Sequence, residues 1–138
     1  MTFFSEKLFI SGSGNIFTFG SNLSGRHGAG AAKFALEFCG AEYGNGYGLQ
    51  GNSFALPTKD EAIRPLPLNI IEAYVQDFLN FASQNTQFAF YVTAIGTGLA
   101  MYTDIQIAPM FVNAPPNCVL PARWKINNNL PLFLVDKT

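Results

Sequence analysis

Positively charged residues are scarce in this chain. Only 8 of its 138 residues are lysine or arginine, against 9 acidic residues, and the formal net charge is −1. Binding along a nucleic-acid backbone needs a broad cationic surface, so the composition argues against extended contact with nucleic acid. A single nucleotide remains a candidate ligand, because backbone N–H groups hold phosphate without many cationic side chains.

Cysteine is equally scarce and lacks metal-binding spacing. Cys39 and Cys118 belong to neither a Cys-x-x-Cys pair nor a Cys/His cluster. The sequence therefore indicates no metal site and no disulfide framework. We expect two reduced, mostly buried thiols, as in a cytoplasmic protein, and the sequence indicates no cofactor.

Long apolar runs are also missing. No stretch approaches the roughly 20 apolar residues that cross a bilayer. The first ten residues contain Glu6 and Lys7 but no basic start and no small-residue cleavage site. We expect a soluble, cytoplasmic protein without a signal peptide or membrane contact. With 49% hydrophobic residues, a chain of this length can bury one substantial core.

Glycine, by contrast, is abundant and unevenly distributed. Of the 13 glycines, 11 lie between Gly12 and Gly51, around a strand-like run at 15–22 and the segment 26–32 that follows it. Glycine inside regular structure costs backbone entropy, so a cluster at a strand-to-helix junction indicates close backbone approach or positive φ. Free N–H groups at a helix N-terminus favour an anion. We therefore predict a loop that binds phosphate.

Hydrophobic periodicity predicts alternating strands and helices. Strands are expected over residues 3–10, 16–19, 52–58, 88–95 and 117–120, and helices over 31–38, 70–82 and 103–111. Thr103 and Gln106 have the spacing of a capping box. The segment 43–51 is too glycine-rich for a helix or a long strand and is predicted to be a second ligand loop. Another loop, at 96–100, follows the strand at 88–95.

This order predicts an α/β fold, a three-layer α/β/α sandwich with a mixed, largely parallel sheet. Ligands bind at the carboxyl ends of strands in such sheets, so the loops at 20–30 and 96–100 are expected to share one cleft. We expect one domain over residues 1–138, with its core at about 15–124. The tail at 125–138 either adds an edge strand or contacts another subunit of a homo-oligomer.

Several side chains near these loops have both a functional and an ordinary interpretation. Asn22 can orient a ribose hydroxyl or a water, or it can satisfy the loop backbone. Arg26 can grip phosphate as a bidentate fork, and His27 can bind phosphate or act as a general base, the alternative being an exposed loop residue. Lys59 and Asp60 have a functional interpretation, as a charge pair or an acid/base pair at the cleft, and a structural one, as a polar turn. The polar turn is favoured.

The sequence argues against two common enzyme classes. It has no complete Gly-x-Gly-x-x-Gly fingerprint of a dinucleotide enzyme and no Gly-x-Ser-x-Gly elbow, and neither cysteine has a nearby histidine. Tyr43, Tyr47 and Gln50 are candidates to stack against or hydrogen-bond a base, with an ordinary packed loop as the alternative.

Three segments together resemble the macro domain superfamily, and its compact phage-associated members in particular. They are the run 16–22, the Gly28-Ala-Gly30 loop that opens a helix, and Ile95-Gly-Thr-Gly-Leu99 before another helix. The resemblance covers about residues 15–124. Macro domains are α/β/α modules that bind ADP-ribose and related NAD-derived nucleotides, and some hydrolyse ADP-ribosyl or phosphate bonds. By motif position, the resemblance implies that Asn22 approaches the distal ribose, that residues 28–30 surround that ribose and the phosphates, and that residues 96–100 wrap the pyrophosphate.

Three positions depart from the macro pattern. By the resemblance, the adenine-contacting Asp either corresponds to Asn15 or is absent, while Leu36 and Ala100 stand where glycohydrolase-type macro domains have a catalytic Lys and Asp. We therefore favour binding over catalysis and assign no catalytic residue. The expected function is capture of ADP-ribose or a related NAD-derived signalling nucleotide. In a phage protein, as the resemblance implies, such capture would sequester a host defence signal.

The predicted ligand-binding residues come from these loops and strand ends. They are Gly20, Ser21, Asn22, Arg26, His27, Gly28, Ala29, Gly30, Gly48, Gln50, Thr58, Gly96, Thr97, Gly98, Leu99 and Ala100. One alternative is an ADP-ribosyl hydrolase or nucleotide phosphatase at the same cleft, with Asn22, His27 or Asp60 handling water. Another is an interaction protein with a vestigial cleft.

Overall fold

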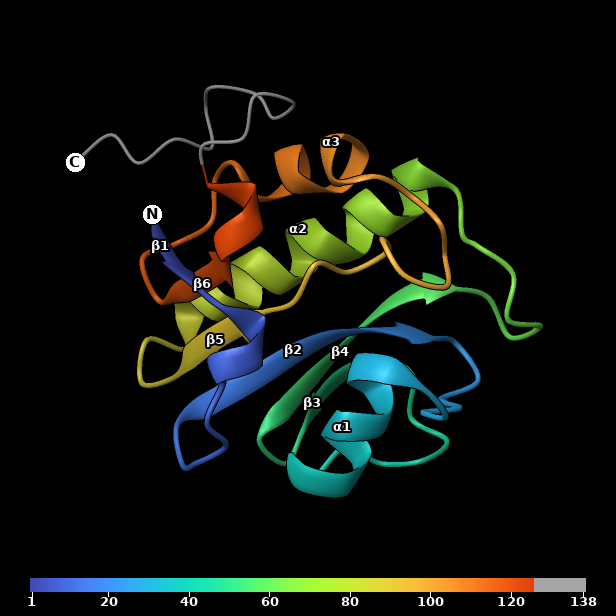
Figure 1. Ribbon diagram of the computed structural model, residues 1–138, viewed down its shortest axis with the longest axis horizontal. Coiled ribbons are helices and arrows are strands. Elements are labelled where there is room, and N and C mark those ends of the chain that lie inside the picture. Colours follow the sequence, from blue (N-terminus) through green and yellow to red (C-terminus); the bar gives the residue numbers. More distant parts are fainter. Residues whose placement is uncertain (126–138) are drawn as a thin grey trace.

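The computed structural model describes residues 1–125, which form a six-stranded, mostly parallel sheet with helices packed against it (Figure 1). The strands are β1 (Thr2–Phe4), β2 (Asn15–Asn22), β3 (Gly48–Gln50), β4 (Ser53–Lys59), β5 (Ala89–Val92) and β6 (Cys118–Pro121). Their order is β1-β6-β5-β2-β4-β3, and only the β3–β4 pair is antiparallel. The predicted α/β fold with a mixed, largely parallel sheet is confirmed.

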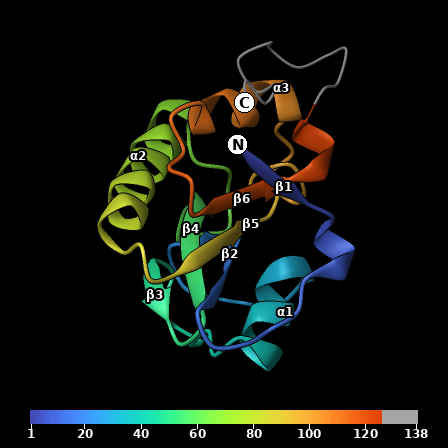
Figure 2. The same ribbon diagram turned by 90° about the vertical axis from the view of Figure 1, so that its left-hand side faces the viewer.

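Helices lie on both faces of this sheet. Within residues 1–125 they are α1 (Gly30–Phe38), α2 (Leu68–Gln84) and α3 (Asp104–Ile107), with 3-10 turns η1 (Glu6–Leu8), η2 (Ala108–Phe111) and η3 (Ala122–Trp124). Figure 2 shows α1 on one side of the sheet and α2 on the other. None of the helices in this part of the chain has both the length and the apolar character to cross a membrane.

The central strand β2 separates two hydrophobic cores. Its side chains alternate between the faces, so Ile16 packs into the core under α2, whereas Phe17 and Phe19 pack with Ala35 of α1. In the α2 core, the Phe54 and Phe78 rings lie 4.9 Å apart, centroid to centroid. Burying each such side chain contributes about 1.5–3 kcal/mol, so the phenylalanine-rich composition fixes the helices on the sheet.

The predictions with strong periodicity hold. The helix predicted at 70–82 is α2, which buries its apolar stripe except for the exposed Ile70 and the half-buried Tyr74. The strand predicted at 88–95 is β5, in the interior of the sheet. The capping box is present, because the Thr103 hydroxyl accepts from the Gln106 N–H at 3.3 Å and the Gln106 side chain accepts from the Thr103 N–H at 2.9 Å.

The first predicted strand, over residues 3–10, is wrong beyond Phe4. The chain leaves the sheet there and turns through η1, which leaves Leu8 and Ile10 exposed. Only Phe9 returns to the interior, against Phe17 and Phe34. The predicted role of the tail at 125–138 lies outside the described residues except for Lys125, whose ammonium lies 5.7 Å from the Phe3 ring centroid.

Both cysteines are free and buried, as the sequence predicted. Burial raises the pKa of the Cys118 thiol to about 12, and burial also raises the pKa of Cys39. Thiolate is the reactive form, so neither residue should react with iodoacetamide at pH 8 in the native protein. Mass spectrometry should find both alkylated after unfolding in guanidinium. Rapid labelling of native Cys118 would contradict its burial.

Candidate functional site

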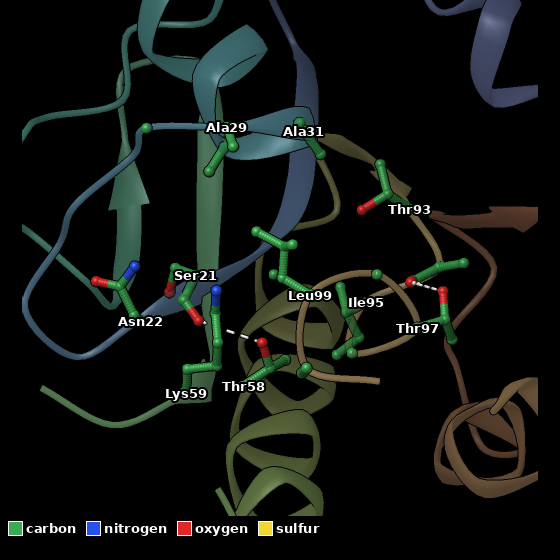
Figure 3. Close-up of a pocket in the computed structure, with 18 of the residues that line it drawn as sticks. Ser21, Asn22, Ala29, Ala31, Thr58, Lys59, Thr93, Ile95, Thr97 and Leu99 are labelled. Carbon is green, nitrogen blue, oxygen red and sulfur yellow. Dashed lines mark hydrogen bonds between the residues drawn. The ribbon is translucent and has the colours of Figure 1, made fainter. Parts of the chain in front are cut away.

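A pocket of about 610 Å³ opens at the carboxyl ends of β2, β4 and β5 (Figure 3). Its lining residues are Glu6, residues 20–22, Arg26, residues 28–32, Thr58, Lys59, Ile63, residues 93–100 and Arg123. Parallel strands direct their following loops to one edge of a sheet, so segments distant in sequence meet here. The loops at 20–30 and 96–100 share this pocket, and a Cβ on Gly20 would lie 3.5 Å from the Gly96 nitrogen.

The first of these loops presents unused N–H donors at the start of α1. The N-cap residue is Ala29, which has no side-chain acceptor, and the first helical bond runs from Lys33 N–H to the Ala29 carbonyl at 3.2 Å. Among the described residues, nothing accepts from the N–H groups of Gly30, Ala31 and Ala32. Helices usually satisfy these donors with a capping side chain, worth about 1 kcal/mol. An anion bound in the pocket would take that role.

The second loop has a similar arrangement. The Gly96 and Gly98 carbonyls accept from Tyr102 and Met101, while nothing in residues 1–125 accepts from the N–H groups of Gly96, Gly98, Leu99 and Ala100. Gly96 has φ +74°, and a Cβ there would lie 3.1 Å from Ile107, so both conformation and space demand glycine. Successive free N–H groups in such a turn form a concave site for an anion.

Four charged side chains line the pocket, and two of its three cationic ones form no ion pair within the described chain. Arg26 and Lys59 are these two. Arg123 pairs with Asp104 at 2.9 Å and donates to the Thr97 hydroxyl at 2.6 Å. These contacts link the second loop to η3. Glu6 accepts from the Ala94 N–H at 3.3 Å. The available positive charge therefore lies on the β2 and β4 side of the pocket.

Asn22 lines the pocket, but its side chain is committed to the loop. Its Oδ1 accepts from the Ser24 hydroxyl at 2.8 Å and from the Arg26 N–H at 2.9 Å, and its Nδ2 donates to the Arg26 carbonyl at 3.0 Å. These contacts match the alternative in which Asn22 satisfies the loop backbone. It shapes the turn that carries Arg26 to the pocket.

Three predicted site residues, His27, Gly48 and Gln50, lie outside the pocket lining. His27 is buried rather than exposed: its Nε2 lies 3.0 Å from the Asn45 carbonyl oxygen, and its ring meets Phe19 edge-on. Gln50 is buried and bridges the Glu42 N–H and the Asn45 carbonyl. Gly48 begins the edge strand β3. These residues hold the segment at 42–50 in place.

The glycine-rich segment at 43–51 therefore supports the first loop instead of contacting the pocket. Gly46 packs so closely on the backbone of Asn22 and Leu23 that a Cβ would overlap it, and Gly25 packs in the same way on Gly44 and Asn45. Here glycine allows two backbone segments to touch. A glycine needed for that contact looks the same in the sequence as a glycine needed for contact with a ligand. Tyr47 packs against Phe54 and Tyr74, and no aromatic side chain lines the pocket within residues 1–125.

Asp60 forms a polar turn, as favoured from the sequence. Its Oδ1 accepts from the Ala62 and Arg64 N–H groups, each at 2.9 Å, and its Oδ2 accepts from the Arg64 side chain at 3.2 Å. The Arg64 backbone hydrogen bond is the main cause that lowers the pKa of the Asp60 carboxyl. The turn holds Ile63 at φ 63°, a rare conformation for a β-branched residue, at the edge of the pocket.

Several lining residues were not among those predicted. They are Glu6, Ala31, Ala32, Lys59, Ile63, Thr93, Ala94, Ile95 and Arg123. Thr93, Ala94 and Ile95 directly precede the second loop and could have been found from the end of the β5 pattern. Glu6 and Arg123 carry no local signal, because the sheet order alone brings their distant segments to the pocket.

Comparison with known proteins gives no relative: no family model, no curated protein and no solved structure matches the chain.

Proposed function

We propose that the pocket binds ADP-ribose or a related NAD-derived nucleotide. The carrying observation is the pair of loops at 28–32 and 96–100, which line one pocket with backbone N–H groups that have no acceptor among the described residues. Two adjacent anion sites suit a diphosphate, and Arg26 and Lys59 add positive charge beside them. The volume of about 610 Å³ lies within the usual range for small-molecule sites.

The base and sugars would rest on apolar and small groups. The sequence predicts aromatic side chains over the base, but the lining offers aliphatic ones instead, Ile63, Ile95 and Leu99. Leu99 is 71% exposed, so a bound ring would remove apolar surface from water. Each Å² so covered contributes roughly 25 cal/mol.

Capture of the ligand is favoured over its cleavage, because the three candidate catalytic side chains are engaged or buried. Asn22 and Asp60 use their side chains within their own turns, and His27 is buried outside the pocket. None of these three is free to activate water. We also propose that the fold is a macro-like three-layer α/β/α sandwich. If the protein acts in a phage, capture of the nucleotide would sequester a host defence signal.

Lys59 provides the test. We expect isothermal titration calorimetry with ADP-ribose to give binding that weakens about tenfold in Lys59→Met, because the variant keeps the aliphatic stem but loses one charge near the phosphates. Lys33→Met is the matched control, since Lys33 pairs with Glu37 on the surface of α1 and does not line the pocket. Its affinity should stay within about twofold, and both variants should melt like the parent.

The fate of the ligand separates the functional classes. Intact ADP-ribose recovered after denaturing the complex supports capture, whereas a released product identified by chromatography would make the protein a hydrolase or phosphatase. Absence of binding heat, and of any rise in melting temperature with ADP-ribose or its cyclic and amino-acid-linked relatives, would overturn the proposal.

A further inference from the structure

Glu6 is the one acidic side chain that lines the pocket in the described part of the chain. It lies in η1, within the segment 3–10 for which the sequence predicted a strand. Its Oε2 accepts from the N–H of Ala94, 88 positions away, so the carboxylate is held against the loop that follows β5. A half-buried acidic side chain in this place faces the same space as the proposed nucleotide.

The carboxylate lacks a cationic partner among residues 1–125. No ion pair involves Glu6, and only its Oε2 makes a hydrogen bond there. The guanidinium of Arg123, which also lines the pocket, is already paired with Asp104. A partly buried carboxylate gains most from a donor that carries positive charge. Within residues 1–125 no such donor is available, and a cationic ligand would supply one.

The sheet order places this carboxylate away from the free cations. Glu6 is bound to Ala94, two residues after β5, while Lys59 ends β4, and β2 lies between these two strands. Neighbouring strands are about 4.8 Å apart, so about 10 Å separates the two strand ends. In Figure 3, Lys59 and Thr93, the latter just after β5, lie on opposite sides of Leu99. The unpaired positive charge of the pocket therefore lies at one end and the unpaired carboxylate at the other.

We propose that Glu6 binds a cationic group, an amine or guanidinium, at the end of the nucleotide remote from its phosphates. This inference rests on the proposed nucleotide site and specifies its ligand class: an ADP-ribose derivative whose terminal ribose carries a positively charged substituent. Like charge excludes phosphate from the Glu6 end, so the same carboxylate also fixes the direction in which the ligand lies.

Two matched ligands and two matched variants test this inference by calorimetry. The ligands are ADP-ribose bearing on its terminal ribose a short alkyl chain that ends in an ammonium or in a methyl group. The wild-type protein should bind the ammonium ligand about 5- to 10-fold more tightly. Glu6→Gln removes the charge but keeps a carbonyl oxygen for the Ala94 N–H, and it should abolish that preference. Glu42→Gln, an exposed carboxylate outside the pocket, should leave it unchanged.

Each outcome has a distinct meaning. Equal weakening of both ligands, and of ADP-ribose itself, in Glu6→Gln would show that Glu6 binds ribose hydroxyls and would overturn a cation site. Equal affinities of the two ligands for the wild type would overturn it as well, while ADP-ribose binding would keep the nucleotide proposal intact. Binding of the ammonium ligand alone, lost in Glu6→Gln, would support the cation site and displace ADP-ribose as the ligand. No binding of any of the three would overturn both.

Discussion

Alanine at Gly46 is expected to destabilise the protein by about 3 kcal/mol or more. The added Cβ would lie 3.0 Å from backbone atoms of Leu23 and closer still to the Asn22 carbonyl oxygen. A side chain could rotate away, but these neighbours are backbone atoms at the end of β2, so one of two loops must move. Ser21, which donates to the Gly46 carbonyl, would lose its partner as well.

Urea unfolding measures this effect against a matched control. Gly12→Ala makes the same chemical change where nothing lies within 4 Å of the new Cβ and where φ is not positive. It should alter the free energy of unfolding by no more than about 0.5 kcal/mol. Because Gly46 supports the loop that carries Arg26, ADP-ribose binding should fall together with stability. Similar unfolding midpoints for the two variants would refute the close contact.

Alanine at His27 is expected to remove about 3 kcal/mol of stability, a fall in melting temperature of about 10 °C. The ring is 1% exposed, packs edge-on to Phe19 at a centroid distance of 5.2 Å, and bonds to the Asn45 carbonyl. Truncation leaves a cavity between the first loop and its supporting segment, and it leaves the Asn45 carbonyl with only the hydrogen bond from Gln50.

Glutamine at the same position separates structure from chemistry. The Gln amide can still donate to the Asn45 carbonyl, so His27→Gln should lose only about 1 kcal/mol and keep its affinity for ADP-ribose within about twofold. A group that binds phosphate or transfers a proton would be replaced no better by Gln than by Ala. The contrary outcome is a His27→Gln variant that melts like the parent but shows no ADP-ribose binding by calorimetry. That result would show that His27 takes part in ligand binding.

The two glycine-rich segments show how far sequence patterns reach. Both segments have the pattern of a ligand loop. Glycine is favoured wherever φ is positive or another group comes close to the backbone, whether that group belongs to a ligand or to the protein. For the segment around Gly28 and Gly30, the lining of the pocket agrees with that interpretation. For the segment around Gly44 and Gly46, the approaching group is the protein's own backbone. No local feature distinguishes a bound ligand from a neighbouring strand end.

Periodicity and capping signals in the sequence were sufficient to identify α2, β5, the capping box at Thr103 and the loop that begins at Gly96. Those features depend on residues within a few positions of one another, where backbone preference and apolar spacing act directly. Tertiary structure alone decided that His27 is buried and that Glu6 and Arg123 reach the pocket. The charge pattern of the pocket arises because the strand order joins segments some 90 to 120 positions apart in the chain, and nothing in their local sequence records that meeting.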